Sequence, residues 1–124
     1  MQDFLLVAFG AVFGSNIRFL ISQKLEKINL NKNLIIIFIN TLSSFFLGLF
    51  SSFVLNTSPL NFSHQWVLFF SIGFLGSLST FSSFIYHLFE LLLQFKFFRA
   101  LKLMIISLAL GIISLAFGFF LGNQ

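Results

Sequence analysis

The sequence predicts an all-α membrane protein with four transmembrane helices. Apolar side chains make up 58% of its 124 residues and charged ones only 8%, and the mean hydropathy is +1.04. A soluble domain covers its surface with far more charge than this. Four apolar stretches, at about 4–22, 34–55, 66–93 and 101–122, are long enough to cross a membrane. A crossing of the hydrocarbon core is about 30 Å and requires roughly 20 residues.

The four stretches use nearly all of the chain, so we expect one membrane domain over residues 1–124. A glycine-rich phosphate loop and cysteine are both absent, so the sequence offers neither an ATP site nor a thiol nucleophile. We therefore expect a protein that is not an enzyme. The first stretch opens with Asp3 and lacks a small-residue cleavage site, which predicts that it stays in the mature protein. The expected location is the plasma membrane.

The first stretch carries a stripe of small and polar residues. Gly10, Gly14 and Arg18 repeat at i, i+4 and i+8, which places them on one face of a helix. Small side chains allow helix backbones to approach closely in lipid. Arg18 has two interpretations: its guanidinium snorkels to the membrane interface, or it faces a protein interior or water.

The second stretch has a similar stripe, formed by Asn40, Ser44, Gly48 and Ser52. Asn40 sits about two turns into the stretch, after the apolar run LIIIFI, so its amide cannot snorkel. An amide at this depth needs a polar partner. The pattern favours a pore or substrate role for Asn40, and a hydrogen bond between helices is the alternative.

The third stretch, 66–93, is longer than one crossing requires. Its 28 residues would extend about 42 Å as a continuous helix. Its segment GFLGSLSTFSSF combines two glycines with five hydroxyl side chains, which weaken a helix through backbone entropy and competing hydrogen bonds. We predict a break between Gly76 and Ser79, whose released carbonyls can hold a small cation such as Na⁺. A continuous helix with back-bonded hydroxyls is the alternative.

Phe81 and Phe84 follow the predicted break and share one helical face, because they are three residues apart. Ring edges turned toward a path would favour a small anion, since the edge of an aromatic ring is positive, but apolar packing is the simpler interpretation. The fourth stretch has small residues at 3/4 spacing, for which helix packing is sufficient. These residues are Ser107, Gly111, Ser114, Gly118 and Gly122.

Three motifs occur in order along the chain. GSNIR places Arg18 four residues after Gly14, NTLSSFFLG begins at Asn40, and GFLGSLSTFSSF begins at Gly73. With four predicted spans and this length, they resemble the Fluc/CrcB family of fluoride channels. The family has a glycine followed four residues later by arginine, then Asn-x-x-Gly-Ser-Phe-x-x-Gly, then a signature close to Gly-x-x-Gly-Gly-Leu-Thr-Thr-Phe-Ser-Thr-Phe. The resemblance covers nearly the whole chain.

The resemblance implies an antiparallel dimer with two pores, in which each third helix breaks at the signature. A central Na⁺, structural and not transported, would be held by backbone carbonyls of both subunits. The matching carbonyls here are those of Gly76 and Ser79. Because these ligands are backbone oxygens, a serine at the family's threonine position need not damage the site. Transport in such proteins is passive, and its role is to let fluoride leave the cytoplasm.

The resemblance also implies which residues line each pore. An asparagine of the second helix would donate a hydrogen bond to the dehydrating ion, two phenylalanines would present their ring edges, and hydroxyls would form a polar track. The matching residues are Asn40, Phe81 and Phe84, Thr80 and Ser83, and Ser107 of the fourth helix, with Arg18 as a structural residue.

The chain departs from the family pattern at several positions. Ser43 and Ser77 replace glycines of the signatures. His87 stands where the family commonly has glutamate, with Glu90 one turn further on, and Leu103 replaces a tyrosine. The outer part of the polar track therefore differs from that of the family.

The cationic residues predict an orientation. All seven Lys and Arg residues fall at the first and third connections, and the opposite side has none. Short loops rich in Lys and Arg stay in the cytoplasm, so both termini are expected outside. A single orientation favours pairing with a homologous subunit of opposite charge bias, and a homodimer is the alternative. The cations are Arg18, Lys24, Lys27, Lys32, Lys96, Arg99 and Lys102.

Two further interpretations concern partners and function. Because the cations lie beside span ends, they indicate membrane topology, and we expect no nucleic-acid partner. The rival function is a small antiparallel drug/proton exporter, which needs a carboxylate within the membrane. The first stretch has no such carboxylate, and Glu90 is the only acidic residue inside a predicted span. A four-span protein without a transport role is the third possibility.

Overall fold

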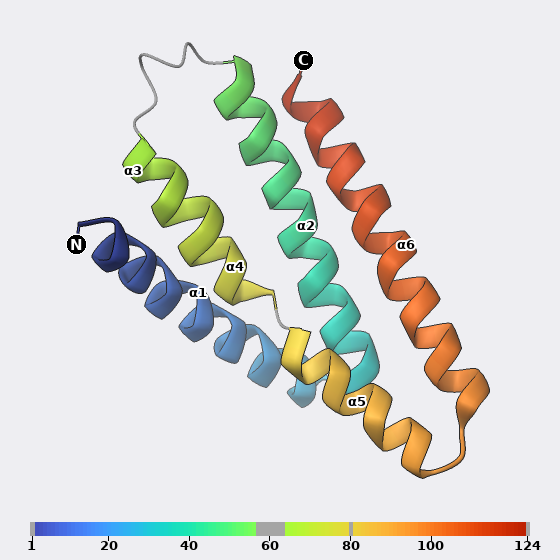
Figure 1. The fold of residues 1–124 in the computed structure, drawn as a ribbon. Helices are drawn as coiled ribbons and strands as arrows, with labels where there is room; N and C mark the ends of the chain where they lie inside the picture. The colour runs from blue at the N-terminus through green and yellow to red at the C-terminus, as the bar shows by residue number, and fades with distance from the viewer. Residues whose placement is uncertain (1, 57–63, 80, 124) are drawn as a thin grey trace.

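The computed structural model describes residues 2–56, 64–79 and 81–123 of the chain. Within these residues every regular element is a helix (Figure 1). The elements are α1 (Gln2–Lys27), α2 (Lys32–Asn56), α3 (His64–Val67), η1 (Leu68–Leu75), α4 (Gly76–Leu78), α5 (Phe81–Leu93) and α6 (Phe97–Gly122).

Four helical stretches among the described residues are long and apolar enough to cross a membrane: Gln2–Lys27, Lys32–Asn56, Leu68–Leu93 and Phe97–Gly122. They include most of each stretch predicted from the sequence, so the all-α membrane fold is confirmed. The protein is a multi-pass membrane protein, which in a bacterium places it in the plasma membrane. The first helix continues five residues past the predicted end at 22, because Gln, Lys, Leu and Glu are good helix formers.

Helices α1 and α5 end in the same backbone motif. After α1, Asn29 adopts a φ of 66°, and the N–H of Leu30 reaches back to the carbonyl of Leu25 at 3.4 Å. After α5, Phe95 adopts a φ of 59°, and the N–H of Lys96 donates to the carbonyl of Leu91 at 2.9 Å. Both are Schellman motifs, which satisfy the last carbonyls of a helix. Asn tolerates this left-handed conformation, whereas a bulky Phe pays a steric cost.

The small-residue stripe of α6 packs on α2. Gly48 of α2 lies against the backbone of Leu115 and Phe119, and Gly118 of α6 lies against that of Phe45. A Cβ at Gly48 would come within 2.9 Å of the Phe119 nitrogen, so only glycine permits this approach. At the end of the pair, the Ser52 hydroxyl donates to Oδ1 of Asn123 at 2.9 Å. For Gly118, the packing role predicted for the small residues of the fourth stretch is confirmed.

A second pair is formed by α1 and the first half of the third span. Gly73 of η1 faces α1, and a Cβ there would lie 2.7 Å from the Val7 carbonyl and 3.1 Å from the Gly10 Cα. Along this contact η1 is a π-helix of 8 residues, so that the N–H of Gly76 points to the carbonyl of Ser71. A π-helix is wider than an α-helix and occurs frequently at functional sites.

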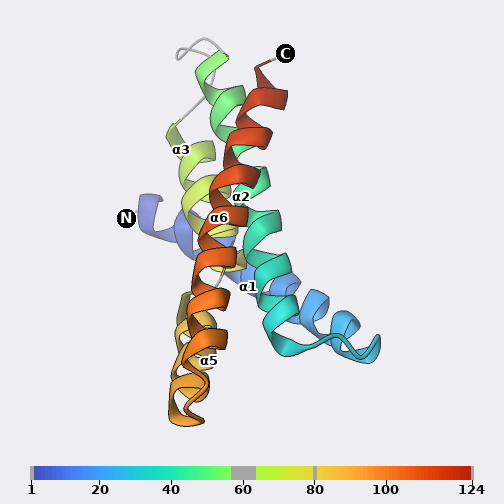
Figure 2. The ribbon, with the colours of Figure 1, turned by 90° about the vertical axis from the view of Figure 1, so that its right-hand side faces the viewer.

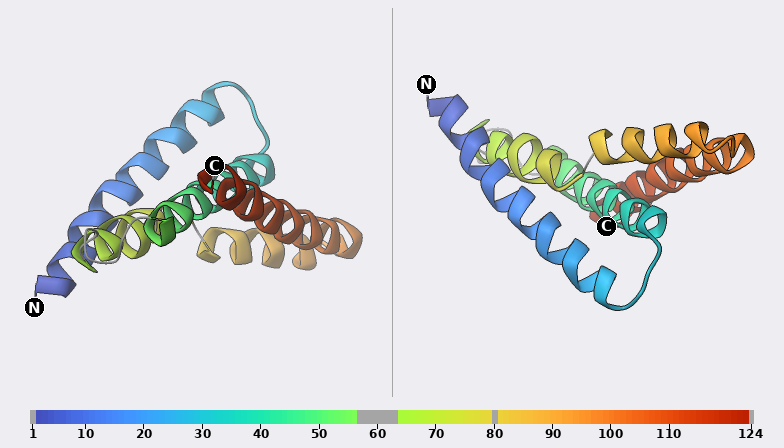
Figure 3. Two further views of the ribbon diagram at one scale, coloured as in Figure 1. Left: turned by 90° about the horizontal axis from the view of Figure 1, so that it is seen from above. Right: turned by 90° about the horizontal axis from the view of Figure 1, so that it is seen from below.

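The two pairs set the shape of the molecule. Viewed from the side and along the helices, α1 and α5 lie at an angle to α2, whereas α6 crosses α2 closely and separates from it toward the α5–α6 turn (Figures 2 and 3). The α1–α2 connection and the α5–α6 turn lie at the same end, and the C-terminus lies at the other (Figure 1). The connections that carry the cations therefore share one end, as the sequence predicted for loops on one side of a membrane.

Candidate functional site

The third span is broken at Ser79. Helix α4 ends at Leu78, and Ser79 has an extended backbone with φ −74° and ψ 155°. The helix resumes at Phe81 with a new direction, as Figure 1 shows. The Ser79 hydroxyl donates to the carbonyl of Gly76 at 3.3 Å, the kind of local hydrogen bond that competes with a helix. The break predicted between Gly76 and Ser79 is confirmed, and it lies at Ser79.

A cavity of about 410 Å³ lies beside the break, and we call it the Asn40 cavity. It is lined by the middle of α2, the break, the start of α5 and the middle of α6. Its described lining residues include no charged side chain. They are Asn40, Ser44, Ser79, Phe81, Phe84, Ser107, Leu108, Gly111, Ile112 and Leu115. Five of the predicted site residues are therefore brought together from three spans.

Ser107 has the most unusual environment in this cavity. Its hydroxyl oxygen is buried and has no hydrogen-bond partner among the described residues. A serine in a membrane helix ordinarily satisfies its hydroxyl by bonding a carbonyl one turn back, as Ser43 does with Ile39 at 2.8 Å. An unsatisfied buried hydroxyl costs about 1–3 kcal/mol. Ser107 thus offers a donor to whatever occupies the cavity.

Phe81 and Phe84 lie at the α5 side of the Asn40 cavity. Their ring centroids are 6.5 Å apart with the ring planes tilted by 41°, so both rings share one helical face as predicted. Phe81 is 75% exposed within the single chain. Its ring therefore lies mostly outside the packed interior of this chain and can contact a neighbouring subunit or an ion.

A smaller cavity of about 110 Å³ also lies beside the break, and we call it the break cavity. It shares Ser44 and Ser79 with the Asn40 cavity, and its lining also includes Ser43, Ser71 and Gly76. Sequence reasoning did not assign Ser44, Ser71 or Gly111 to a site. The helical stripe that contains both Asn40 and Ser44 was a signal in the sequence that could have assigned Ser44 to the site. The position of Ser71, in contrast, depends on the π-helical geometry of η1.

Arg18 and Ser83, also predicted as site residues, line a separate polar cavity of about 270 Å³ at the end that carries the cations. We call it the Arg18 cavity. Arg18 lies well inside α1, which continues to Lys27, so it is farther from the helix end than the sequence suggested. Thr80 lies outside the described residues. The lining residues are Arg18, Ser22, Glu26, Lys32, Ile35, Ile36, Ile39, Ser83 and His87.

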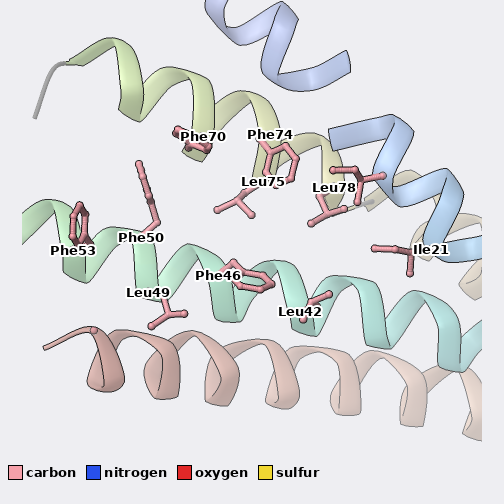
Figure 4. A pocket seen from close by; sticks show the side chains of 12 residues that line it. Ile21, Leu42, Phe46, Leu49, Phe50, Phe53, Phe70, Phe74, Leu75 and Leu78 are labelled. Atoms are coloured by element: carbon pink, nitrogen blue, oxygen red, sulfur yellow. The ribbon is translucent and has the colours of Figure 1, made fainter. Parts of the chain in front are cut away.

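A groove of about 590 Å³ between the two helix pairs has an apolar lining. Figure 4 shows side chains of η1 and α2 turned toward this space, among them Phe50, Phe70 and Phe74. The rings of Phe50 and Phe70 are 5.8 Å apart. Because the described side chains that line it offer no hydrogen-bond donor, this groove does not suit an anion, and the Asn40 cavity remains the candidate site.

A family model described as CrcB-like protein, Camphor Resistance (CrcB), matches residues 5–119. That range includes most or all of each of the four spans and every described residue of the Asn40 cavity. The chain belongs to the CrcB family. The resemblance based on the three motifs is thereby confirmed, and the CrcB match extends to residue 119 of α6, a helix in which none of those motifs lies.

Similar proteins have related names. "Fluoride-specific ion channel FluC 2" of Prochlorococcus marinus (strain NATL2A) is 58% identical over 124 residues, covering 100% of both chains. "Fluoride-specific ion channel FluC" of Thermosipho melanesiensis is 37% identical over 98% of this chain and 97% of its own. "Fluoride-specific ion channel FluC 1" of Prochlorococcus marinus (strain MIT 9313) is 32% identical over 95% of this chain and 90% of its own. The CrcB relatives of this chain thus carry the names of ion channels and not of enzymes.

Proposed function

We propose that this chain is a subunit of a fluoride-selective passive channel that lets fluoride leave the cytoplasm. The observation that carries the proposal is the unpartnered Ser107 hydroxyl, buried in the same cavity as Asn40 and Ser44. Hydrogen-bond donors in an uncharged cavity are what a small dehydrating anion requires. The names of the CrcB relatives support fluoride as that anion.

The chemistry proposed for the Asn40 cavity is hydrogen bonding without fixed charge. The Asn40 amide and the Ser107 hydroxyl would donate to fluoride while it sheds water, and Ser44 extends the row of donors. Strong positive charge would hold the anion too tightly, since conduction requires a site that also releases its ion. Apolar neighbours such as Leu108 and Ile112 exclude water from the remaining wall.

Phe81 and Phe84 would complete the path by presenting ring edges to the ion. The edge of an aromatic ring carries partial positive charge and therefore attracts a small anion. It has no acidic proton that it could lose to that anion. The exposure of Phe81 supports a pore assembled from two chains, in which part of the lining comes from a second subunit. Thr80 and Ser83 are proposed to continue the polar track on the same segment.

The proposed assembly is an antiparallel dimer with a structural Na⁺ at its centre. The residues at the break fit such an ion, because the break cavity is lined by Ser43, Ser71, Gly76 and Ser79, which bear hydroxyl and carbonyl oxygens, and none of its described lining residues is charged. Backbone carbonyls at helix breaks are typical ligands of Na⁺. When bound, the ion would join the two third spans, with Gly76 and Ser79 contributing carbonyls.

The partner is proposed to be a homologous subunit inserted in the opposite orientation. The cations gather at one end of the helices, which favours one orientation for this chain. Relatives named both FluC 1 and FluC 2 support the existence of paired homologues. A homodimer remains the alternative.

The drug/proton exporter receives less support. Glu90 does not line the Asn40 cavity and instead lies 3.5 Å from Nδ1 of His87. If Glu90→Gln abolished transport of a lipophilic cation by this chain, the exporter would replace the channel.

Fluoride resistance tests the proposed function in cells. A bacterial host without its own fluoride channels, co-expressing this chain and a CrcB homologue of opposite charge bias, should grow at fluoride concentrations that stop the parent strain. Asn40→Ala should abolish this growth, whereas Asn31→Ala, in the exposed α1–α2 connection, should retain it at equal expression. Failure of the native pair to protect, with both chains present in the membrane, would contradict the proposal.

A further inference from the structure

The turn between α5 and α6 carries positive charge that the Asn40 cavity does not use. Lys96 directly precedes α6, and Arg99 and Lys102 share one face of its first two turns, because they are three residues apart. All three side chains are exposed. The sequence has no Asp or Glu after Glu90, and none of these three cations forms an ion pair in the part of the chain that the structure describes. The turn is therefore a cationic surface without a counter-charge of its own.

An exposed apolar face of α6 runs beside these cations. Phe98, Leu101 and Ile105 follow one another at spacings of three and four, which places them on one side of the helix, and they are 90%, 50% and 55% exposed. Lys102 is one turn from Phe98, and a lysine rests its apolar stem on such a neighbour while its ammonium stays in a polar medium. Cations and apolar side chains thus form one surface, which we call the turn patch. Its residues are Lys96, Phe98, Arg99, Leu101, Lys102 and Ile105.

Phe95, in the turn itself, has an unfavourable backbone conformation. Its φ of 59° lies in the left-handed region, where a bulky side chain is an outlier. Its ring is 81% exposed, and the ring centroid is 6.2 Å from that of Phe97. Strain of this kind is common where a residue is held in place for function. Here it holds an aromatic ring outside the packed part of the chain, next to the cations.

The position of the turn suggests what surrounds the patch. The turn joins two helical stretches that are long and apolar enough to cross a membrane, Leu68–Leu93 and Phe97–Gly122, so it lies at a membrane surface. It lies apart from the α1–α2 connection, at the far end of its own hairpin (Figures 2 and 3). At that depth cations meet the phosphate groups of lipids, and apolar side chains meet acyl chains.

We propose that the turn patch binds the headgroup phosphate of an anionic phospholipid and that an acyl chain of the same lipid lies along Phe98, Leu101 and Ile105. The Arg99 guanidinium can hold a phosphate through two parallel hydrogen bonds, and the two lysines act as point charges. Cations close to a membrane surface favour anionic lipids. A zwitterionic lipid brings a cation of its own to the patch, and a free phosphate leaves the apolar face uncovered.

A single introduced cysteine can report the lipid at one place, because the chain has no cysteine. Gln94→Cys places a bimane fluorophore in the α5–α6 turn, and Gln23→Cys places it at an exposed position near the end of α1, beside Lys24 and Lys27. The full chain, alone or with a homologous partner that lacks cysteine, is placed in nanodiscs of phosphatidylcholine. Brominated phosphatidylglycerol or brominated phosphatidylcholine then replaces the same small fraction of the lipid, and quenching of the bimane measures how much of each lies at the label.

The proposal predicts a lipid preference at the turn. At Gln94→Cys, brominated phosphatidylglycerol should quench about five times as strongly as brominated phosphatidylcholine, the preference that one cation near a membrane surface supplies. The ratio at Gln23→Cys should be lower, because Glu26 offsets part of the positive charge there. Equal quenching by the two lipids at Gln94→Cys, or the same ratio at both positions, would overturn the proposal. No quenching by either lipid at Gln94→Cys would mean that protein covers the turn, and would overturn it as well.

Matched charge variants locate the preference within the turn. Replacing Arg99 and Lys102 together with Gln should bring the ratio at Gln94→Cys close to one. Replacing Lys24 and Lys27 together with Gln removes the same charge from exposed positions of α1 and should leave that ratio unchanged. All four side chains are exposed, so both double variants should fold, which their circular dichroism reports. An equal fall of the ratio in the two double variants would contradict a site at the turn patch.

Competing salts separate a bound lipid from a free phosphate. Sodium phosphate and sodium chloride at equal ionic strength should lower the ratio at Gln94→Cys by the same partial amount, because both screen the cations. The measurement uses no fluoride, so its outcome is independent of the proposed function. Loss of the preference in phosphate but not in chloride would make free phosphate the ligand and overturn the assignment to a lipid.

Discussion

Ser107 is the residue whose surroundings most directly suggest a ligand. Its hydroxyl is buried without a partner, while Ser43 on α2 bonds its own helix. Removing an unsatisfied hydroxyl relieves a desolvation cost, so Ser107→Ala should leave stability unchanged or raise it by about 1 kcal/mol. The same change should lower fluoride efflux about tenfold, since it removes a donor that serves only the ion.

Ser114→Ala is the matched control for Ser107. It removes a hydroxyl two turns further along α6 that does not line the Asn40 cavity. Efflux should match the native pair in this variant, and thermal unfolding of both variants should be measured alongside. An equal loss of efflux in the two variants, or a loss of stability confined to Ser107→Ala, would mean that the Ser107 hydroxyl serves helix packing.

Local chemistry made the break of the third span predictable. Two glycines and five hydroxyls in GFLGSLSTFSSF weaken a helix wherever they occur, and the Ser79 hydroxyl does bond the Gly76 carbonyl. The π-helix before the break was not predictable in this way. The π-helix lies where Gly73 contacts Val7 and Gly10, which are more than sixty positions away in sequence.

For the candidate site too, some features could be predicted from the sequence and others required the structure. The spacing of Asn40 and Ser44, and of Phe81 and Phe84, indicated shared faces from the sequence alone. Which cavity each face lines depends on how the helices cross, so the separation of Ser83 and Arg18 from the Asn40 cavity required the structure. The burial of Ser107 without a partner required it as well.

The break is also the element at which the proposed Na⁺ can be tested. An ion that binds only the folded dimer stabilises it in proportion to the logarithm of its concentration. Replacing Na⁺ by N-methylglucamine should therefore lower the melting temperature and the dimer fraction together, and fluoride efflux with them. Ser79→Ala should have a mild effect, because the proposed ligand is the Ser79 carbonyl.

Two outcomes would contradict this assignment of the break. One is a melting temperature that does not change between Na⁺ and N-methylglucamine at equal ionic strength. The other is a loss in Ser79→Ala as large as the loss on removing Na⁺, which would make the hydroxyl the ligand or a part of the pore.

The whole molecule carries its cations at one end, and this asymmetry predicts its orientation. Reporter fusions at Gln124 should report almost entirely an external C-terminus. Replacing Lys24, Lys27 and Lys96 with Gln should raise the cytoplasmic fraction, because it reduces the difference between the two sides. Comparable cytoplasmic and external signals from the native chain would instead favour the homodimer.

Selective fluoride conduction by the assembled protein is the central claim, and liposome efflux measures it most directly. Vesicles loaded with potassium fluoride or potassium chloride receive the purified chain, alone or with a homologous partner of opposite orientation, and valinomycin starts the efflux. We expect rapid fluoride release, chloride release at the level of empty vesicles, and loss of fluoride release in Asn40→Ala. Chloride release as fast as fluoride release, or fluoride release that Asn40→Ala leaves intact, would contradict the claim.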